Sequence, residues 1–297
     1  MKRYILATVL SLATTAACAG VAEQELESCS KANAASKYNE AIEYAAAAIK
    51  TSSDNRTAYL CQARAYVGLN DYAHALASLV PADQLAKTNL EHIVTLLLIG
   101  NSYKELKEFD KAIDQYKKGR ELSQKERDAH FEMVSLNNIG MAQEGKSDYA
   151  AAVENYLLAQ TLAANETERA ESHAHLASAY SALNNYDKAI EHQIKAAFMG
   201  ERGSDFDQYA NSGLELGRVY LQAKQYANAE KTLNKLLENI ILNKDLYWES
   251  KGNYYLSLVK REQGDIKIAD KLLEKAKEEA KSIEANDLLK LFSVRGK

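Results

Sequence analysis

Hydrophobic and polar residues alternate along this chain of 297 residues with the period of an α-helix, and the pattern restarts at intervals. The stretch 177–197 shows the unit clearly. Small and aromatic residues mark one face of a first helix, Asn184 and Asn185 interrupt the pattern, and Tyr186 and Ala189 begin it again. The stretch predicts two amphipathic helices joined by a short turn.

The same unit recurs seven times, and each copy has a large apolar residue just after its turn. We call these residues the turn markers: Tyr38, Tyr72, Phe109, Tyr149, Tyr186, Tyr226 and Ile266. The steps between them are 34, 37, 40, 37, 40 and 40 residues. A period of this size is typical of a helical solenoid, in which each repeat packs only on its neighbours. With a single proline in the chain, the sequence predicts one elongated all-α domain over residues 20–297.

The residues around the markers resemble the tetratricopeptide repeat (TPR) family. That family has Gly or Ala nine residues before the marker, an aromatic residue six before it, Ala three after it and a large apolar residue seven after it. Gly100, Gly140, Ala177 and Gly217 match the first position, and Ala stands at the third in all seven copies. The resemblance implies an α-α superhelix of about seven helix-turn-helix repeats, with a helix A and a helix B in each.

Small residues suit the place where helix A crosses helix B, because a larger side chain would hold the two backbones apart. We therefore expect Gly217→Leu to lower stability, whereas Gly145→Ala, placed in a turn, should do little. The family's proline at the end of the repeat is missing and most steps exceed 34 residues, which predicts longer helices. A final helix near 286–295, burying Leu288, Leu289 and Leu291, should cap the array.

The first 19 residues have the pattern of a bacterial secretory signal peptide. Lys2 and Arg3 precede an apolar run of about a dozen residues, which is too short to span a bilayer comfortably. Ala17-Cys18-Ala19 then fits the small-residue site at which such signal peptides are cleaved. The sequence predicts export to the periplasm or the medium.

Cys18 supports an alternative form of export. The stretch Thr15-Ala-Ala-Cys18 resembles the box at which bacterial lipoproteins are cut and acylated, although Leu normally stands where Thr15 does. In that case the protein is an outer-membrane lipoprotein. Association with a membrane is expected only if Cys18 is lipidated.

Cys29 and Cys61 fall in the first helices of adjacent repeats. An oxidising compartment would allow them to form a disulfide. Two small buried apolar side chains are the other interpretation, and the sequence leaves both open because it does not give the distance between the Cα atoms.

Charge and motifs point away from nucleic acids, cofactors and catalysis. The formal net charge is −4, and loss of the signal leaves 35 basic against 41 acidic residues. Gly140 to Ser147 has the letters of a phosphate-binding loop, but it follows a predicted helix instead of a strand. His173 and His175 lie two residues apart and point to opposite sides of a helix, which is unsuitable for one metal ion. We expect no enzyme activity.

In the TPR family, the helix A residue after the packing Gly or Ala faces the concave groove. The resemblance therefore implies a partner-binding groove with Arg64, Asn101, Met141, Ser178 and Arg218. Two arginines predict a protein or peptide segment with acidic ends and an apolar residue near Met141. The family's clamp for a C-terminal carboxylate is not expected, because Leu97, Glu171 and His175 occupy its basic positions.

The leading hypothesis is an exported TPR scaffold that binds a segment of a cell-envelope protein. A periplasmic sensor module for a small peptide signal is an alternative from the same compartment. A hydrolase built on the helical array is the alternative from another class, and no Ser/His/Asp or Cys/His spacing supports it.

Overall fold

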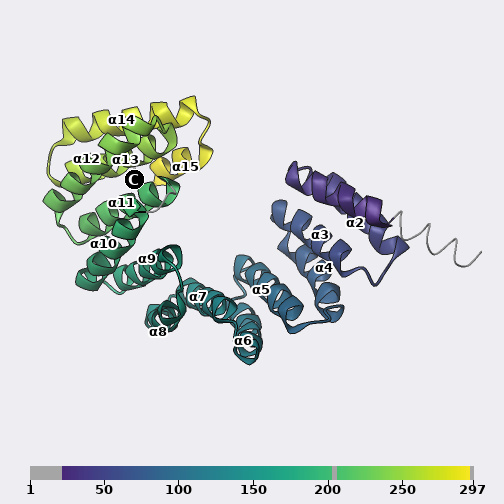
Figure 1. Cartoon of the computed structure of the whole chain (residues 1–297). Coiled ribbons are helices and arrows are strands. Elements are labelled where there is room, and N and C mark those ends of the chain that lie inside the picture. The colour runs from purple at the N-terminus through teal and green to yellow at the C-terminus, as the bar shows by residue number, and fades with distance from the viewer. Residues whose placement is uncertain (1–21, 203–205, 295–297) are drawn as a thin grey trace, which may run out of the picture. The chain divides into compact units, whose positions relative to one another are not determined.

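The computed structural model describes residues 22–202 and 206–294, and every regular element within these ranges is a helix (Figure 1). A first helix covers residues 22–34. The others are α2 (Tyr38–Thr51), α3 (Arg56–Gly68), α4 (Tyr72–Gln84), α5 (Asn89–Glu105), α6 (Phe109–Glu126), α7 (Ala129–Gly145), α8 (Tyr149–Leu162), α9 (Glu166–Ala182), α10 (Tyr186–Arg202), α11 (Phe206–Gln222), α12 (Tyr226–Asn243), α13 (Leu246–Glu262), α14 (Ile266–Ser282) and α15 (Asn286–Val294). The expected all-α architecture is confirmed.

Each turn marker begins a helix B, and the turn before it has the same geometry in every repeat. The residue two before the marker has a positive φ of 57–62° or, at Gly264, 90°. The next N–H donates to the carbonyl five residues earlier, for example Asp71 to Tyr66 at 2.8 Å and Asn185 to Tyr180 at 2.9 Å. This is the left-handed ending that satisfies the last carbonyls of helix A. Only the last turn uses glycine for it.

The helices form two compact units, one ending at Asp148 and the other beginning at Tyr149. In the first, the helices from residue 22 to α7 pack in sequence order, as α5 does on α6 and α6 on α7. In the second, α9 packs on α10, α11 on α12 and α13 on α14. The single domain expected over residues 20–297 stays a prediction, and the expected signal at 1–19 lies outside the described residues.

The alanine three residues after each marker is fully buried. Ala41, Ala75, Ala112, Ala152, Ala189, Ala229 and Ala269 all have an exposed fraction of 0%. The glycines nine before the marker behave in the same way. A Cβ on Gly100 would lie 2.4 Å from the Tyr116 ring, and a Cβ on Gly217 would lie 2.5 Å from Leu233 Cδ2. Both partners stand seven after a marker, so helices A and B cross where the repeat pattern predicts.

The expectation for Gly145 is wrong. It is the last residue of α7 and not part of an open turn, and a Cβ there would lie 2.3 Å from the Phe109 ring. A Cβ on Gly68 would likewise lie 2.4 Å from the Tyr38 ring. Both glycines stand four residues before a marker, and both lie against the marker ring of the preceding repeat. In these two repeats the missing side chain makes room for a neighbour's aromatic ring.

Helix length accounts for the long steps between markers. The 34-residue step contains helices of 14 and 13 residues, whereas the 40-residue step after Phe109 contains helices of 18 and 17. The longer helices B end on left-handed residues, Arg127 after α6 and Lys244 after α12. The prediction of longer helices is confirmed.

The capping helix is also confirmed, with one difference in the residues that it buries. α15 runs from Asn286 to Val294 and packs on α13 and α14. Leu288 and Phe292 are each 2% exposed, whereas Leu289 and Leu291 are only partly buried. The Phe292 ring stacks on Tyr254 with centroids 4.6 Å apart. Phe292, which was not among the residues predicted to be buried, therefore closes the core of the second unit.

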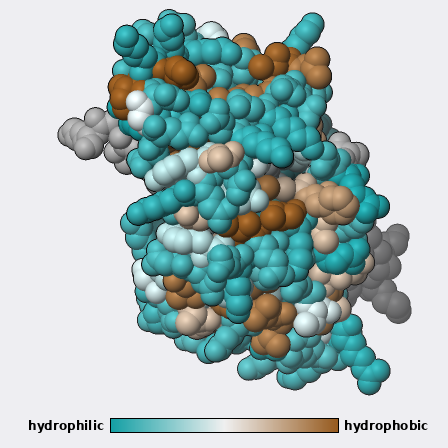
Figure 2. All heavy atoms as spheres, turned by 90° about the vertical axis from the view of Figure 1, so that its left-hand side faces the viewer, coloured by the Kyte–Doolittle hydropathy of each residue, from teal (hydrophilic) through white to brown (hydrophobic). Residues whose placement is uncertain are grey.

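The surface is mostly hydrophilic, with separate hydrophobic groups on the side drawn in Figure 2. Among large apolar residues, Leu242 is 79% exposed and Phe198 56% exposed. No helix in the described part of the chain has the length and apolar character that crossing a membrane requires.

Candidate functional site

A cleft of about 490 Å³ lies among the helices A of the first unit. We call it the helix-A cleft. Its lining comes from α3 and α5, with contributions from α4 and α7: Leu60, Ala63, Arg64, Val67, Tyr72, Leu79, Val94, Leu98, Asn101, Ser102, Lys104, Glu105 and Asn138. Most of these side chains are apolar, so the cleft suits an apolar group bordered by a few polar contacts.

Arg64 and Asn101, both predicted to face the groove, line this cleft together. Arg64 is exposed, and within the described ranges no ion pair joins its guanidinium. Asn101 is fixed in place because the Tyr116 hydroxyl donates to its Oδ1 at 2.7 Å. Burial raises the pKa of Tyr116, so the hydroxyl keeps its proton and stays a donor. One cation and one fixed amide thus border an apolar hollow.

Lys104 is the second cation of the cleft, and it already has a partner. Its Nζ lies 3.6 Å from Glu105 Oε1, and its side chain is 24% exposed. Asn138 lines the cleft from α7. The uncompensated positive charge of this cleft therefore belongs to Arg64.

The other predicted groove residues are not part of the helix-A cleft. Met141 is half-buried on α7, outside the lining. In the second unit Ser178 is exposed on α9. Arg218 is half-buried, and its guanidinium already has two hydrogen-bond partners. Its Nε donates to Glu215 Oε2 at 2.5 Å, and its Nη1 donates to Gln222 Oε1 at 2.8 Å. A carboxylate of its own helix already neutralises Arg218, so the prediction of a free cation at that end has no support.

A different cation lies on the same face of the second unit. Lys251, on α13, has its Nζ 4.9 Å from the Trp248 ring centroid and 3.5 Å from Asn211 Oδ1. Burial lowers the pKa of Lys251, while Glu215 and Asp287 act in the opposite direction. Trp248 is oriented by its Nε1, which donates to Asp207 at 2.7 Å. Sequence reasoning missed this group because it considered only the residue after the packing glycine.

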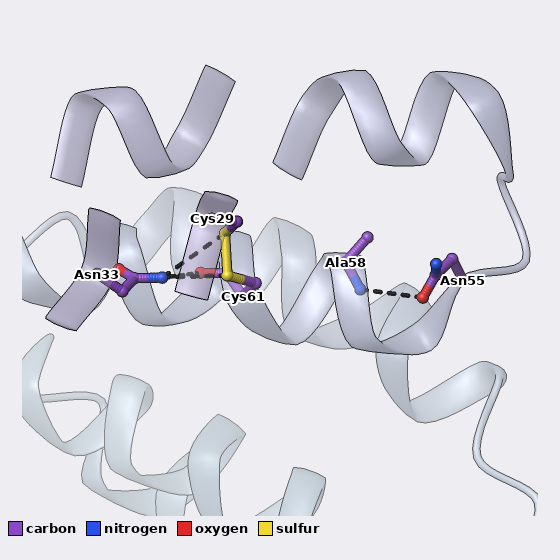
Figure 3. The surroundings of a disulfide bond; sticks show 5 residues. All are labelled: Cys29, Asn33, Asn55, Ala58 and Cys61. Carbon is purple, nitrogen blue, oxygen red and sulfur yellow. Dashed lines mark hydrogen bonds between the residues drawn. A yellow bond between two sulfur atoms is a disulfide. The ribbon is translucent and has the colours of Figure 1, made fainter. Parts of the chain in front are cut away.

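Cys29 and Cys61 join the first two repeats. Their sulfur atoms are bonded at 1.97 Å and their Cα atoms lie 6.4 Å apart (Figure 3). Asn33 Nδ2 donates to the Cys61 carbonyl at 3.0 Å and approaches its sulfur at 3.2 Å. The bridge is buried, with Cys29 0% and Cys61 8% exposed. Of the two interpretations left open by the sequence, the geometry agrees with the disulfide. Cys18 lies outside the described residues.

The two motifs that imitate catalytic or metal chemistry have structural roles. Gly140 to Gly145 lie within α7, where backbone N–H groups belong to the helix, and Lys146 pairs with Asp110 at 2.5 Å. His173 and His175 point to different neighbours. The Nδ1 of His173 lies 2.8 Å from that of His192, and the His175 ring stacks on Tyr156 at 4.9 Å. Among the described residues, no three or more His, Cys, Asp or Glu side chains group as metal ligands.

Comparison with known proteins identifies the repeats. A tetratricopeptide repeat model matches residues 94–126 and 170–197, and a second one matches residues 212–239. The chain is 26% identical over 170 residues to the heat shock protein STI1 of Saccharomyces cerevisiae. The match covers 56% of this chain but only 27% of that protein.

Solved structures agree on the fold. RapI in its apo form superposes with a TM-score of 0.63 at 13% identity, over 89% of this chain and 99% of that one. BtubC (BKLC) from P. vanneervenii gives a TM-score of 0.59 at 17% identity, over 72% and 89%. The chain contains tetratricopeptide repeats with the all-α TPR fold, a scaffold for protein–protein interaction.

Proposed function

We propose that this chain is an exported TPR scaffold that holds a segment of a cell-envelope protein in its helix-A cleft. The observation that carries the proposal is the pairing of Arg64 with Asn101 at the border of one apolar hollow of about 490 Å³. An exposed guanidinium favours a carboxylate on the partner, and the fixed amide offers its N–H₂ group to a backbone carbonyl. The partner is therefore an extended or helical segment with an apolar side chain beside an acidic one.

Two features support the exported setting. Residues 1–19 have the composition of a secretory signal, and a buried cystine is typical of oxidising compartments. Mass spectrometry of the protein from fractionated cells tests the setting. A chain beginning at Gly20 in the periplasm or the medium agrees with soluble export, and an acylated Cys18 in the outer membrane agrees with the lipoprotein alternative. A chain that keeps Met1 in the cytoplasm contradicts both.

The binding proposal is tested with a partner captured from envelope extract and then purified. Arg64→Ala should weaken its binding by about 1–2 kcal/mol in calorimetry, with an unchanged helical circular-dichroism signal. Arg218→Ala should cost less, because Glu215 already neutralises that side chain. Lys118→Ala, an exposed change on α6, is the matched control. If the Arg64 and Lys118 variants bind equally well, the helix-A cleft is not the site.

A further inference from the structure

The second unit has a cleft of its own, of about 420 Å³. It lies between α10 and α12, the helices B of adjacent repeats, and α11 forms its floor. We call it the B-helix slot. Its lining residues are Ile194, Ala197, Phe198, Glu201, Tyr209, Gly213, Leu216, Tyr220, Asn228, Lys231, Thr232, Lys235 and Leu236.

The slot lies opposite the face of α11 on which the groove was predicted. Tyr209, Gly213 and Leu216 form its floor, whereas Arg218 and its partner Glu215 belong to the predicted groove face. Gly213 and Glu215 are two residues apart, which corresponds to about 200° around a helix. The B-helix slot is therefore separate from the predicted groove face of its own unit, and it shares no lining residue with the helix-A cleft.

The floor of the slot differs from the equivalent place in the adjacent repeats. The markers Tyr186, Tyr226 and Ile266 are 40 residues apart, so His173, Gly213 and Asn253 hold equivalent positions. His173 contacts His192 at 2.8 Å, and Asn253 donates to Glu279 at 3.1 Å. At both places a side chain from helix A meets helix B. At Gly213 there is no side chain, and Leu236 of α12 packs against the bare backbone, since a Cβ on Gly213 would lie 2.9 Å from Leu236 Cδ2.

The two walls of the slot differ in chemistry. On α10, Ile194 and Phe198 are one turn apart and are 44% and 56% exposed. On α12, Lys231 and Lys235 are one turn apart and point to the same side. Across the slot, Lys235 Nζ lies 3.6 Å from Glu201 Oε1. Both side chains are largely exposed, so this ion pair contributes little stability and a partner carboxylate can replace it. One wall is apolar, the other is basic and the floor is aromatic and aliphatic.

We propose that the B-helix slot binds an amphipathic helix of a partner protein that carries two acidic residues one turn apart. Its apolar face rests on Phe198 and the α11 floor, and its two carboxylates meet Lys231 and Lys235. The floor from Tyr209 to Tyr220 is about 16 Å long at 1.5 Å per residue, which corresponds to roughly three turns of the bound helix. An apolar stripe beside one acidic edge is the pattern that this pair of unlike walls recognises.

The test uses the full chain and a pair of fluorescein-labelled helical peptides of 14 residues. Both have leucines at i, i+3, i+4 and i+7, and beside this stripe one has two glutamates and the other two lysines, one turn apart. Fluorescence anisotropy should show the acidic peptide binding at least ten-fold more tightly. Phe198→Ser and the double change Lys231→Glu with Lys235→Glu should each weaken it ten-fold or more. The double variant should instead prefer the basic peptide.

The control is Lys267→Glu with Lys271→Glu, the same charge change with the same spacing on α14, where both lysines are exposed. It should leave binding within two-fold of wild type, as should Arg64→Ala in the helix-A cleft. A benzophenone on the peptide should cross-link to α10 or α12. Equal affinity for both peptides, cross-links confined to α3 and α5, or binding to phosphatidylglycerol vesicles in place of the peptide would each overturn the proposal.

Discussion

The first two repeats and the last two are stabilised by different means. The core around the disulfide consists of small side chains, Cys29 and Cys61 with Ala32, Ala41, Ala45 and Ala65. The core closed by α15 contains Leu, Ile, Tyr and Phe side chains, among them Leu233, Ile240, Tyr254 and Phe292. A buried alanine contributes about one methyl group of apolar burial, whereas Leu or Phe contributes about 1.5–3 kcal/mol.

The comparison indicates how each end of the array is secured. An open end of a solenoid must be stabilised without a further repeat beyond it. The C-terminal end has enough large side chains for an added helix to bury. In the described part of the N-terminal end, alanines leave little for such a helix, and a covalent bond joins the first two helices A. We infer that the N-terminal repeats depend on the disulfide and the C-terminal repeats on α15.

Phe292→Ala should have the largest effect. Loss of a fully buried aromatic ring from α15 is expected to cost about 3–5 kcal/mol, and the loss should be confined to the second unit. Hydrogen exchange should show lower protection in α13 and α14 with that of α3 unchanged. Leu242→Ala, at a site that is 79% exposed, is the control and should change stability by less than about 0.5 kcal/mol. Uniform loss of protection through both units would contradict the comparison.

Removal of the disulfide should come next. Cys29 and Cys61 are separated by 32 residues, for which chain entropy gives about 3–4 kcal/mol of stabilisation. The double change of both cysteines to Ala should lower the free energy of unfolding of the first unit by about that amount. Reducing agent should destabilise the wild type but not the variant. Alkylation of both thiols in the folded, unreduced protein would show that no bond exists.

Replacing one glycine in each unit by alanine tests the packing around a single added methyl group. Gly145→Ala should cost about 1–3 kcal/mol in thermal unfolding, because the Phe109 ring at 2.3 Å is rigid. Gly217→Ala in the second unit should also be destabilising, because the added Cβ would lie 2.5 Å from Leu233 Cδ2, and Leu233 is fully buried. Gly119→Ala is the control, since its nearest neighbour is 3.6 Å away. A larger loss at Gly119 than at Gly145 would contradict this assignment.

The smallest expected effect is a pH dependence in the second unit. Burial, with His192 and Lys195 nearby, lowers the pKa of His173 to about 4, and burial also lowers that of His192. The unfolded state therefore binds protons first, and stability should fall as the pH drops from about 6.5 towards 4. His173→Gln should make the melting temperature less sensitive over this range. His74→Gln, an exposed change in the first unit, should leave that sensitivity as it was.

Sequence alone predicted the features that depend on local spacing. The markers begin the helices B, the alanines three residues later are fully buried, and α15 lies within the range 286–295 expected for the final helix. These positions are fixed by helical periodicity within one repeat. The positions of Arg64 and Asn101 in one cleft also followed, because equivalent residues of adjacent helices A lie side by side.

What the sequence did not predict depends on the identity of a distant side chain. Gly145 was assigned to a turn because nothing in its own repeat shows the Phe109 ring above it. Arg218 was expected to be free to bind a partner, although the i,i+3 spacing of Glu215 and Arg218 on one helix already favours an ion pair. The bond between Cys29 and Cys61 required a Cα distance, 6.4 Å, that periodicity does not supply. The B-helix slot is lined by side chains of three helices, α10, α11 and α12, whose packing periodicity alone does not supply.

The left-handed residues that end the longer helices B mark places where insertions and deletions can be tolerated during evolution. Arg127, Lys244 and Glu284 each stand 18 residues after a marker, beyond the alanine and large apolar positions that bury the repeat. Residues inserted or deleted just before them lengthen or shorten a helix at its outer end and leave the register of the buried positions unchanged. Repeats of 34, 37 and 40 residues can thus coexist in one array, and insertions near these three residues should be tolerated far better than insertions between a marker and its alanine.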